Sequence, residues 1–111
     1  MKLYKGSIVE NSLSDKSILN ELKINSTKHA GAWIIHDVLI SGDQINMIGK
    51  YINNGPWYMH FWLDGSNEVR MVFNDKIFTI DYSDKSTWIE AVKYGKGKGI
   101  PEDQLDFLIS I

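Results

Sequence analysis

Residues 55–65 read GPWYMHFWLDG, and the order of side chains in this stretch decides the fold. Gly-Pro before it and Asp-Gly after it are turn signals, so the aromatic segment between them is predicted to be a strand over residues 57–63. Side chains alternate between the two faces of a strand. One face therefore carries Trp57, Met59, Phe61 and Leu63, and the other carries Tyr58, His60 and Trp62.

Two more strands are predicted directly after this one, over residues 68–73 and 77–81, which makes a C-terminal antiparallel meander. The apolar side chains of the first two strands share a face if Asp64 pairs with Glu68 across a three-residue loop. A two-residue turn at 74–75 extends this alignment, since Asn and Asp tolerate the backbone of such turns. The predicted core face of the meander is Trp57, Met59, Phe61, Leu63, Val69, Met71, Phe73, Phe78 and Ile80.

The first half of the chain adds two predicted strands, over residues 3–10 and 32–40. The second, AWIIHDVLI, is apolar on both alternating faces, which is typical of a central strand. Residues 25–31, NSTKHAG, are predicted to be a loop.

Helices are predicted between these strands. Ser14 or Asp15 is placed to begin a short one, and Ser41 with Gln44 forms a capping-box pattern at the start of another. Further helices are predicted over residues 83–95 and from Pro101 onward.

The predicted order is therefore β-α-β-α-β-β-β-α-α. We expect a single α+β domain over residues 1–111. It would contain a mixed sheet of about five strands, end in the antiparallel meander and pack its helices mainly on one face.

Composition excludes several classes of protein. The 111 residues include no cysteine, so disulfides, thiol catalysis and thiolate metal sites are excluded. No apolar run is long enough to cross a membrane and no secretory leader is seen, so we expect no membrane partner and a cytoplasmic location. The net charge of −2 and the single arginine, Arg70, argue against nucleic-acid binding.

The face of the meander opposite the predicted core is the candidate contact surface. In the predicted register Trp62 lies opposite Arg70, whose guanidinium can stack on the indole ring. Aromatic and arginine side chains gathered on one exposed patch are typical of contact surfaces. The predicted binding residues are Tyr58, His60, Trp62, Arg70 and Val72. The alternative is that another segment of the chain covers this face.

The sequence gives only weak evidence for a catalytic, metal-binding or anion-binding motif. His29 lies in a predicted loop, and His36 and His60 could form an acid–base pair only if their strands brought them together. No ligand spacing supports a metal site, no cofactor motif is present, and no catalytic residue is assigned. The segment YGKGKGIP, residues 94–101, follows a helix rather than a strand, so it is typical of a helix end more than of an anion-binding loop.

Three functions follow from these observations. The first is a protein-binding or self-associating module that uses the aromatic sheet face. The second is a small enzyme or ligand-binding protein with a pocket containing His60 and Arg70. The third, nucleic-acid binding through Tyr58, Trp62 and the lysines of residues 93–98, is opposed by the charge balance.

Overall fold

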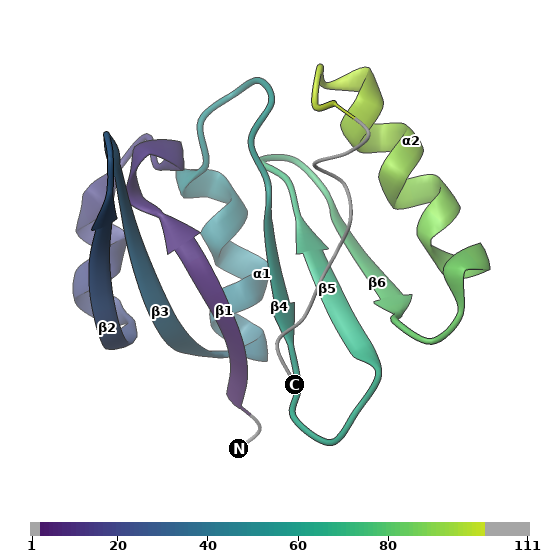
Figure 1. Cartoon of the computed structure of the whole chain (residues 1–111), viewed down its shortest axis with the longest axis horizontal. Coiled ribbons are helices and arrows are strands. Elements are labelled where there is room, and N and C mark those ends of the chain that lie inside the picture. The colour runs from purple at the N-terminus through teal and green to yellow at the C-terminus, as the bar shows by residue number, and fades with distance from the viewer. Residues whose placement is uncertain (1–2, 102–111) are drawn as a thin grey trace.

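The computed structural model describes residues 3–101, in which six strands form one antiparallel sheet (Figure 1). Their order across the sheet is β2-β3-β1-β4-β5-β6, and every neighbouring pair is antiparallel. The strands are β1 (Leu3–Val9), β2 (Lys23–Ala30), β3 (Trp33–Ser41), β4 (Met59–Trp62), β5 (Glu68–Val72) and β6 (Ile77–Asp81). The α+β prediction is confirmed and the predicted number of about five strands is approximately right, but the sheet is antiparallel, so the prediction of a mixed sheet is wrong.

The strand that the sequence analysis missed is β2, most of which was predicted to be a loop. It is an edge strand that pairs only with β3, and all eight of its side chains are exposed. Because neither face is buried, its sequence has no apolar alternation to reveal it. Gly31, at φ 63°, supplies the turn into β3.

Two helical segments lie on one side of the sheet, behind it in Figure 1. The helix α1 (Gly42–Ile48) begins at the predicted capping box: Gln44 N–H donates to Ser41 Oγ (3.2 Å) and Ser41 N–H donates to Gln44 Oε1 (3.0 Å). The predicted helix after Asp15 is the 3₁₀ segment η2 (Lys16–Glu21), with Asp15 as its N-cap. Two shorter 3₁₀ turns are η1 (Glu10–Ser12) and η3 (Gly49–Tyr51).

The helix α2 (Ile89–Gly97) lies on the other side of the sheet, over β5 and β6. The 3₁₀ turn η4 (Lys85–Trp88) leads into it, and the Asp84 carboxylate caps η4 by accepting a hydrogen bond from Ser86 N–H (3.0 Å). The helix runs two residues beyond its predicted end at Gly95. The short helix predicted from Pro101 lies outside the described residues.

Helices on both sides give the protein two hydrophobic cores. The core on the α1 side of the sheet includes Tyr4, Ile8, Ile18, Val38, Ile40, Ile45, Ile48, Met59, Phe61 and Val72. The core on the α2 side consists of Val69, Met71, Phe73, Ile80, Trp88, Ala91 and Ile100, with Phe78 packed against it. The prediction that the helices pack mainly on one face, and that the meander has a single core face, is therefore wrong.

Candidate functional site

The pairing of β4 with β5 decides where the predicted binding residues lie. The register places Phe61 opposite Arg70 and Trp62 opposite Val69, one residue away from the predicted pairing. The connection contains four residues rather than three, and Ser66 N–H donates to the Leu63 carbonyl (3.1 Å) within it. A one-residue shift exchanges the faces of a strand.

The prediction was wrong because it assumed that only one face of the meander is buried. With helices on both sides, β4 can bury Met59 and Phe61 against α1 while β5 buries Val69 and Met71 against α2. Apolar side chains on neighbouring strands then need not share a face. The second hairpin was predicted correctly, since Phe73 N–H donates to the Lys76 carbonyl (2.8 Å) and Met71 pairs with Phe78.

The shifted register divides the five predicted binding residues between the two sides of the sheet. Tyr58, His60 and Trp62 lie on the α2 side and are partly exposed. Arg70 and Val72 lie on the α1 side, where Val72 is fully buried. His60 and Arg70 therefore do not share a pocket.

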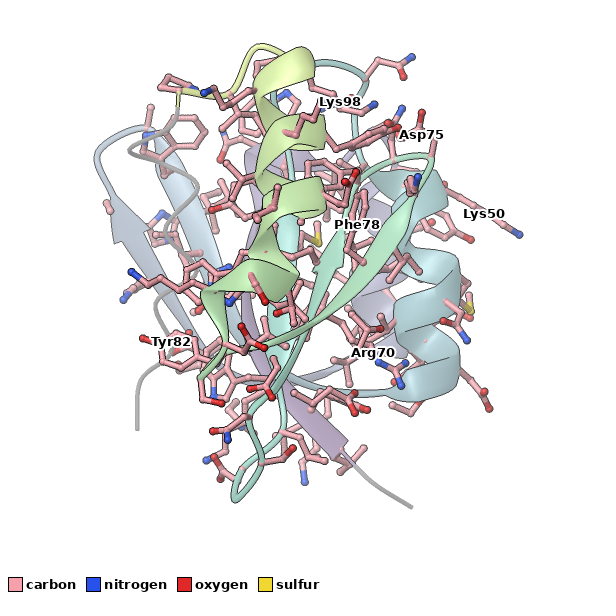
Figure 2. All side chains as sticks on the ribbon, turned by 90° about the vertical axis from the view of Figure 1, so that its right-hand side faces the viewer. Lys50, Arg70, Asp75, Phe78, Tyr82 and Lys98 are labelled. Carbon is pink, nitrogen blue, oxygen red and sulfur yellow. The ribbon has the colours of Figure 1, made fainter. Side chains whose placement is uncertain are left out.

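Arg70 also has a different aromatic partner from the one predicted. Its guanidinium lies 4.8 Å from the centre of the Tyr4 ring, beside α1 (Figure 2), and its Nε donates to Glu68 Oε2 (3.1 Å). The Tyr4 hydroxyl donates to the same carboxylate oxygen (2.5 Å), and this hydrogen bond raises the pKa of Tyr4. Arg70 is thus part of a cluster that packs the α1 side.

The rings of Tyr58, just before β4, and of His60 and Trp62 on β4 form a ladder along the α2 side. The Tyr58 and His60 rings are stacked with centres 6.2 Å apart, and the His60 and Trp62 rings lie 5.7 Å apart. Because Trp62 pairs with Lys5, the ladder borders the α2-side surface of β1.

That surface continues over β1, β3 and β2, where no helix among the described residues covers it (Figure 1). The burial pattern defines it: residues 4, 6, 8, 36, 38 and 40 are buried toward α1, while their neighbours in sequence point the other way. We name this surface the open sheet face; it consists of Leu3, Lys5, Ser7, Val9, Lys23, Ser26, Lys28, Ile35, Asp37 and Leu39. None of these residues is buried, and Leu3 is 42% exposed.

A recess of about 340 Å³ lies at the junction of the open sheet face with Trp62. At its centre, Asp37 Oδ1 accepts a hydrogen bond from Ser7 Oγ (2.8 Å) and Asp37 Oδ2 accepts one from Ser26 Oγ (2.9 Å). Both hydroxyl groups lower the pKa of Asp37 because they stabilise the carboxylate, and Ser7 has the larger effect. Asp37 is therefore ionised at neutral pH, and Lys5 lines the same recess.

The Trp62 side chain contributes an unsatisfied donor to this region. Its indole Nε1 is buried, and no described residue accepts a hydrogen bond from it. A buried donor without a partner costs about 1–3 kcal/mol.

A hydrogen-bonded network around His36 of β3 lies on the α1 side of the sheet, opposite the recess. His36, 7% exposed, has its Nδ1 2.8 Å from Thr27 Oγ1 and its Nε2 3.1 Å from Glu10 Oε1. The hydrogen bond with His36 lowers the pKa of Glu10. Since His60 lies on the α2 side, the strands do not bring His36 and His60 together, and the condition for an acid–base pair is not met.

A hydroxyl, an imidazole and a carboxylate in series also activate nucleophiles in hydrolases. Here Thr27 belongs to an exposed edge strand, and none of the described cavities is lined by Thr27, His36 or Glu10. We interpret the network as the hydrogen bonding that allows His36 to be buried.

Sequence reasoning missed the Ser7, Ser26 and Asp37 cluster because two of its members lie in segments with weak or no strand pattern. Asp37 itself was visible, with His36, as one of two polar residues in an apolar strand. Within residues 3–101, no group of three His, Asp or Glu side chains could hold a metal ion. The same part of the chain contains no helix long and apolar enough to cross a membrane.

Comparison with known proteins gives no relative: no family model, curated protein or solved structure matches this chain. The function is therefore argued from the geometry.

Proposed function

We propose that this chain is a self-associating protein module, and that two copies contact each other through the open sheet face and the neighbouring Trp62. The observation that carries the proposal is a sheet surface with apolar side chains that no described helix covers, although α1 packs on the opposite face and α2 packs on the neighbouring strands β5 and β6 on the same side. Uncovered apolar surface of this kind is typical of interaction sites.

The charges on the open sheet face favour a second copy over an acidic or a basic partner. Lysines 5, 23 and 28 are interspersed with Asp37, and Asp64 lies beside them in an ion pair with Lys5 (2.5 Å). In a two-fold symmetric contact the same patch is used by both copies, so a patch must be complementary to itself. A patch that carries both signs of charge around apolar side chains meets this condition.

Edge pairing through β2 is a less favourable way to associate. The register of β2 shifts between Ile24 and Ser26, which is a bulge, and lysines stand at positions 23 and 28. Bulges and lysines on an edge strand oppose strand addition. The proposed contact is therefore face to face.

The test is the mass in solution, measured by light scattering over a range of concentrations. We expect a species of twice the 12.7 kDa chain mass, and we expect Leu39→Asp to convert it to a folded monomer. Lys28→Glu should weaken the dimer without touching any buried side chain, because residue 28 is exposed. Ile89→Asp, which makes a similar change on the outer surface of α2, is the matched control and should leave the dimer intact.

A wild-type chain that stays monomeric up to millimolar concentration would overturn the proposal. So would a dimer that Ile89→Asp disrupts while Leu39→Asp and Lys28→Glu do not. Circular dichroism of each variant shows whether a loss of mass reflects unfolding. If Leu39→Asp does not fold, Lys28→Glu decides the question.

A further inference from the structure

A second surface feature lies on α2, away from the open sheet face. A groove of about 460 Å³ runs along this helix, which stands in front of the sheet in Figure 2. The described residues that line it are Lys85, Trp88, Ile89, Val92, Lys93 and Lys96, and we name it the basic groove. They recur at helical spacing, so they share one side of η4 and α2.

The floor of the basic groove is apolar and its rim is cationic. Ile89 is 61% exposed, the largest exposure among the big apolar side chains of residues 3–101. The ammonium group of Lys85 lies 5.5 Å from the Trp88 ring centre. No carboxylate is among the described lining residues, and no described carboxylate lies within ion-pair distance of Lys85 or Lys93.

The helix dipole explains only part of this arrangement. Lysines in the last turn of a helix compensate the negative C-terminal end, which accounts for Lys96. Lys85 precedes the helix, where a positive charge is unfavourable. Neither the dipole nor core packing accounts for the exposed Ile89 at the first position of α2.

We propose that the basic groove binds a small amphiphilic anion, such as a medium-chain fatty acid, with its acyl chain on Ile89, Val92 and Trp88 and its carboxylate among the lysines. The volume lies in the range of small-molecule sites, roughly 300–1,000 Å³. It is too small for a protein partner, because such interfaces use about 20–30 residues on each side. A membrane surface would require a broader apolar face, and the inner side of α2 is already packed in the core.

The test uses the full chain and dodecanoate below its micellar concentration, with binding followed by NMR chemical shifts. Dodecyltrimethylammonium has the same tail and the opposite charge, so it is the matched probe. We expect saturable binding of dodecanoate only, with shifts centred on residues 85–96. The double substitution Lys85→Gln and Lys93→Gln should weaken binding by about tenfold or more. Ile89→Ser should weaken it as well, while Lys50→Gln, on η3, is the control and should have no effect.

Three results would overturn this assignment. The first is equal binding of the cationic probe, which would indicate a non-specific apolar contact. The second is an equal loss for Lys50→Gln and Lys93→Gln, which would indicate an effect of net charge alone. The third is binding to vesicles of anionic phospholipid without binding of monomeric dodecanoate, which would indicate a membrane surface instead.

Discussion

Phe61 lies directly against the backbone of Gly6, its partner on β1. A Cβ atom at Gly6 would stand 2.8 Å from Phe61 Cε1 and 2.9 Å from the His60 carbonyl oxygen, closer than such contacts allow. The absence of a side chain at Gly6 therefore permits this close approach between β1 and β4. Through this contact β1 joins the β2–β3 hairpin to the meander.

Gly6→Ala should accordingly destabilise the fold by about 1–3 kcal/mol, because the added methyl group overpacks the centre of the sheet. The free energy of unfolding in urea measures this. Gly97→Ala is the matched control: a Cβ there meets nothing within 4 Å and the residue ends α2, so a small stabilisation of about 0.5 kcal/mol is expected. Equal effects at the two glycines would contradict the close approach of Phe61.

Val72→Thr tests the register of β4 and β5. The structure buries Val72 fully on the α1 side, so a hydroxyl group there would have no water to hydrogen-bond with. The substitution should therefore lower the free energy of unfolding by about 1–3 kcal/mol. Thr79→Val makes the reverse change on the exposed edge strand β6 and should alter stability by less than about 0.5 kcal/mol. If Val72→Thr were neutral by urea denaturation, the originally predicted register, with residue 72 on an open face, would be favoured.

Asp37 should make stability depend on pH in the acidic range. Its pKa in the folded protein is lowered by Ser7 and Ser26, so its contribution is complete above the unfolded pKa and is lost as pH falls through the folded pKa. The difference in unfolding free energy between wild type and Asp37→Asn should therefore shrink between about pH 6 and about pH 2.

The control for this prediction is a variant with Ser7→Ala and Ser26→Ala. Without the two hydroxyl donors, the effect of Asp37→Asn on the free energy of unfolding should vary much less with pH. The remaining variation comes from the weaker influence of Lys28. Urea midpoints for the four proteins across this pH range give the comparison. A pH-dependent difference of the same size in both backgrounds would show that the hydroxyl groups are not its cause.

Thr27→Val tests whether the buried imidazole of His36 depends on its neighbour. The substitution removes the hydroxyl group 2.8 Å from Nδ1, so it should cost about 1 kcal/mol although valine is a good strand former. Thr27→Ser keeps the hydroxyl group and should retain most of the stability. Equal unfolding free energies for the valine and serine variants would rule out a contribution from this hydrogen bond.

Local patterns in the sequence were sufficient for much of the fold. The Ser41–Gln44 capping box and the turn at residues 74–75 form as predicted, and Asp15 is the N-cap of the two candidates, Ser14 and Asp15, because each feature depends on side chains within a few residues. The strands over most of 3–10, 32–40 and the meander were also predicted, since apolar alternation or continuous apolarity marks them. The identity of buried residues such as Phe61, Met71 and Ile80 followed from the same pattern.

The candidate site could be predicted only in part. Trp62 was predicted to be a contact residue from its strand position, and that stays a prediction, whereas Arg70 and Val72 were assigned to the same surface through the wrong register. Ser7, Ser26 and Asp37 come from three separate strands, and only the sheet order brings them together. No spacing along the chain encodes that order.

The sequence by itself determined where the strands of the meander lie, which turns and caps begin and end most elements, and which side chains are apolar enough to be buried. Only the tertiary structure decided that β2 is an edge strand, that β1 lies between β3 and β4, and that helices cover both sides of the sheet. The physical reason is that caps, turns and alternation depend on neighbours in the chain. The face that a strand buries depends instead on which helix packs against it, and α1 and α2 reach the sheet from opposite sides.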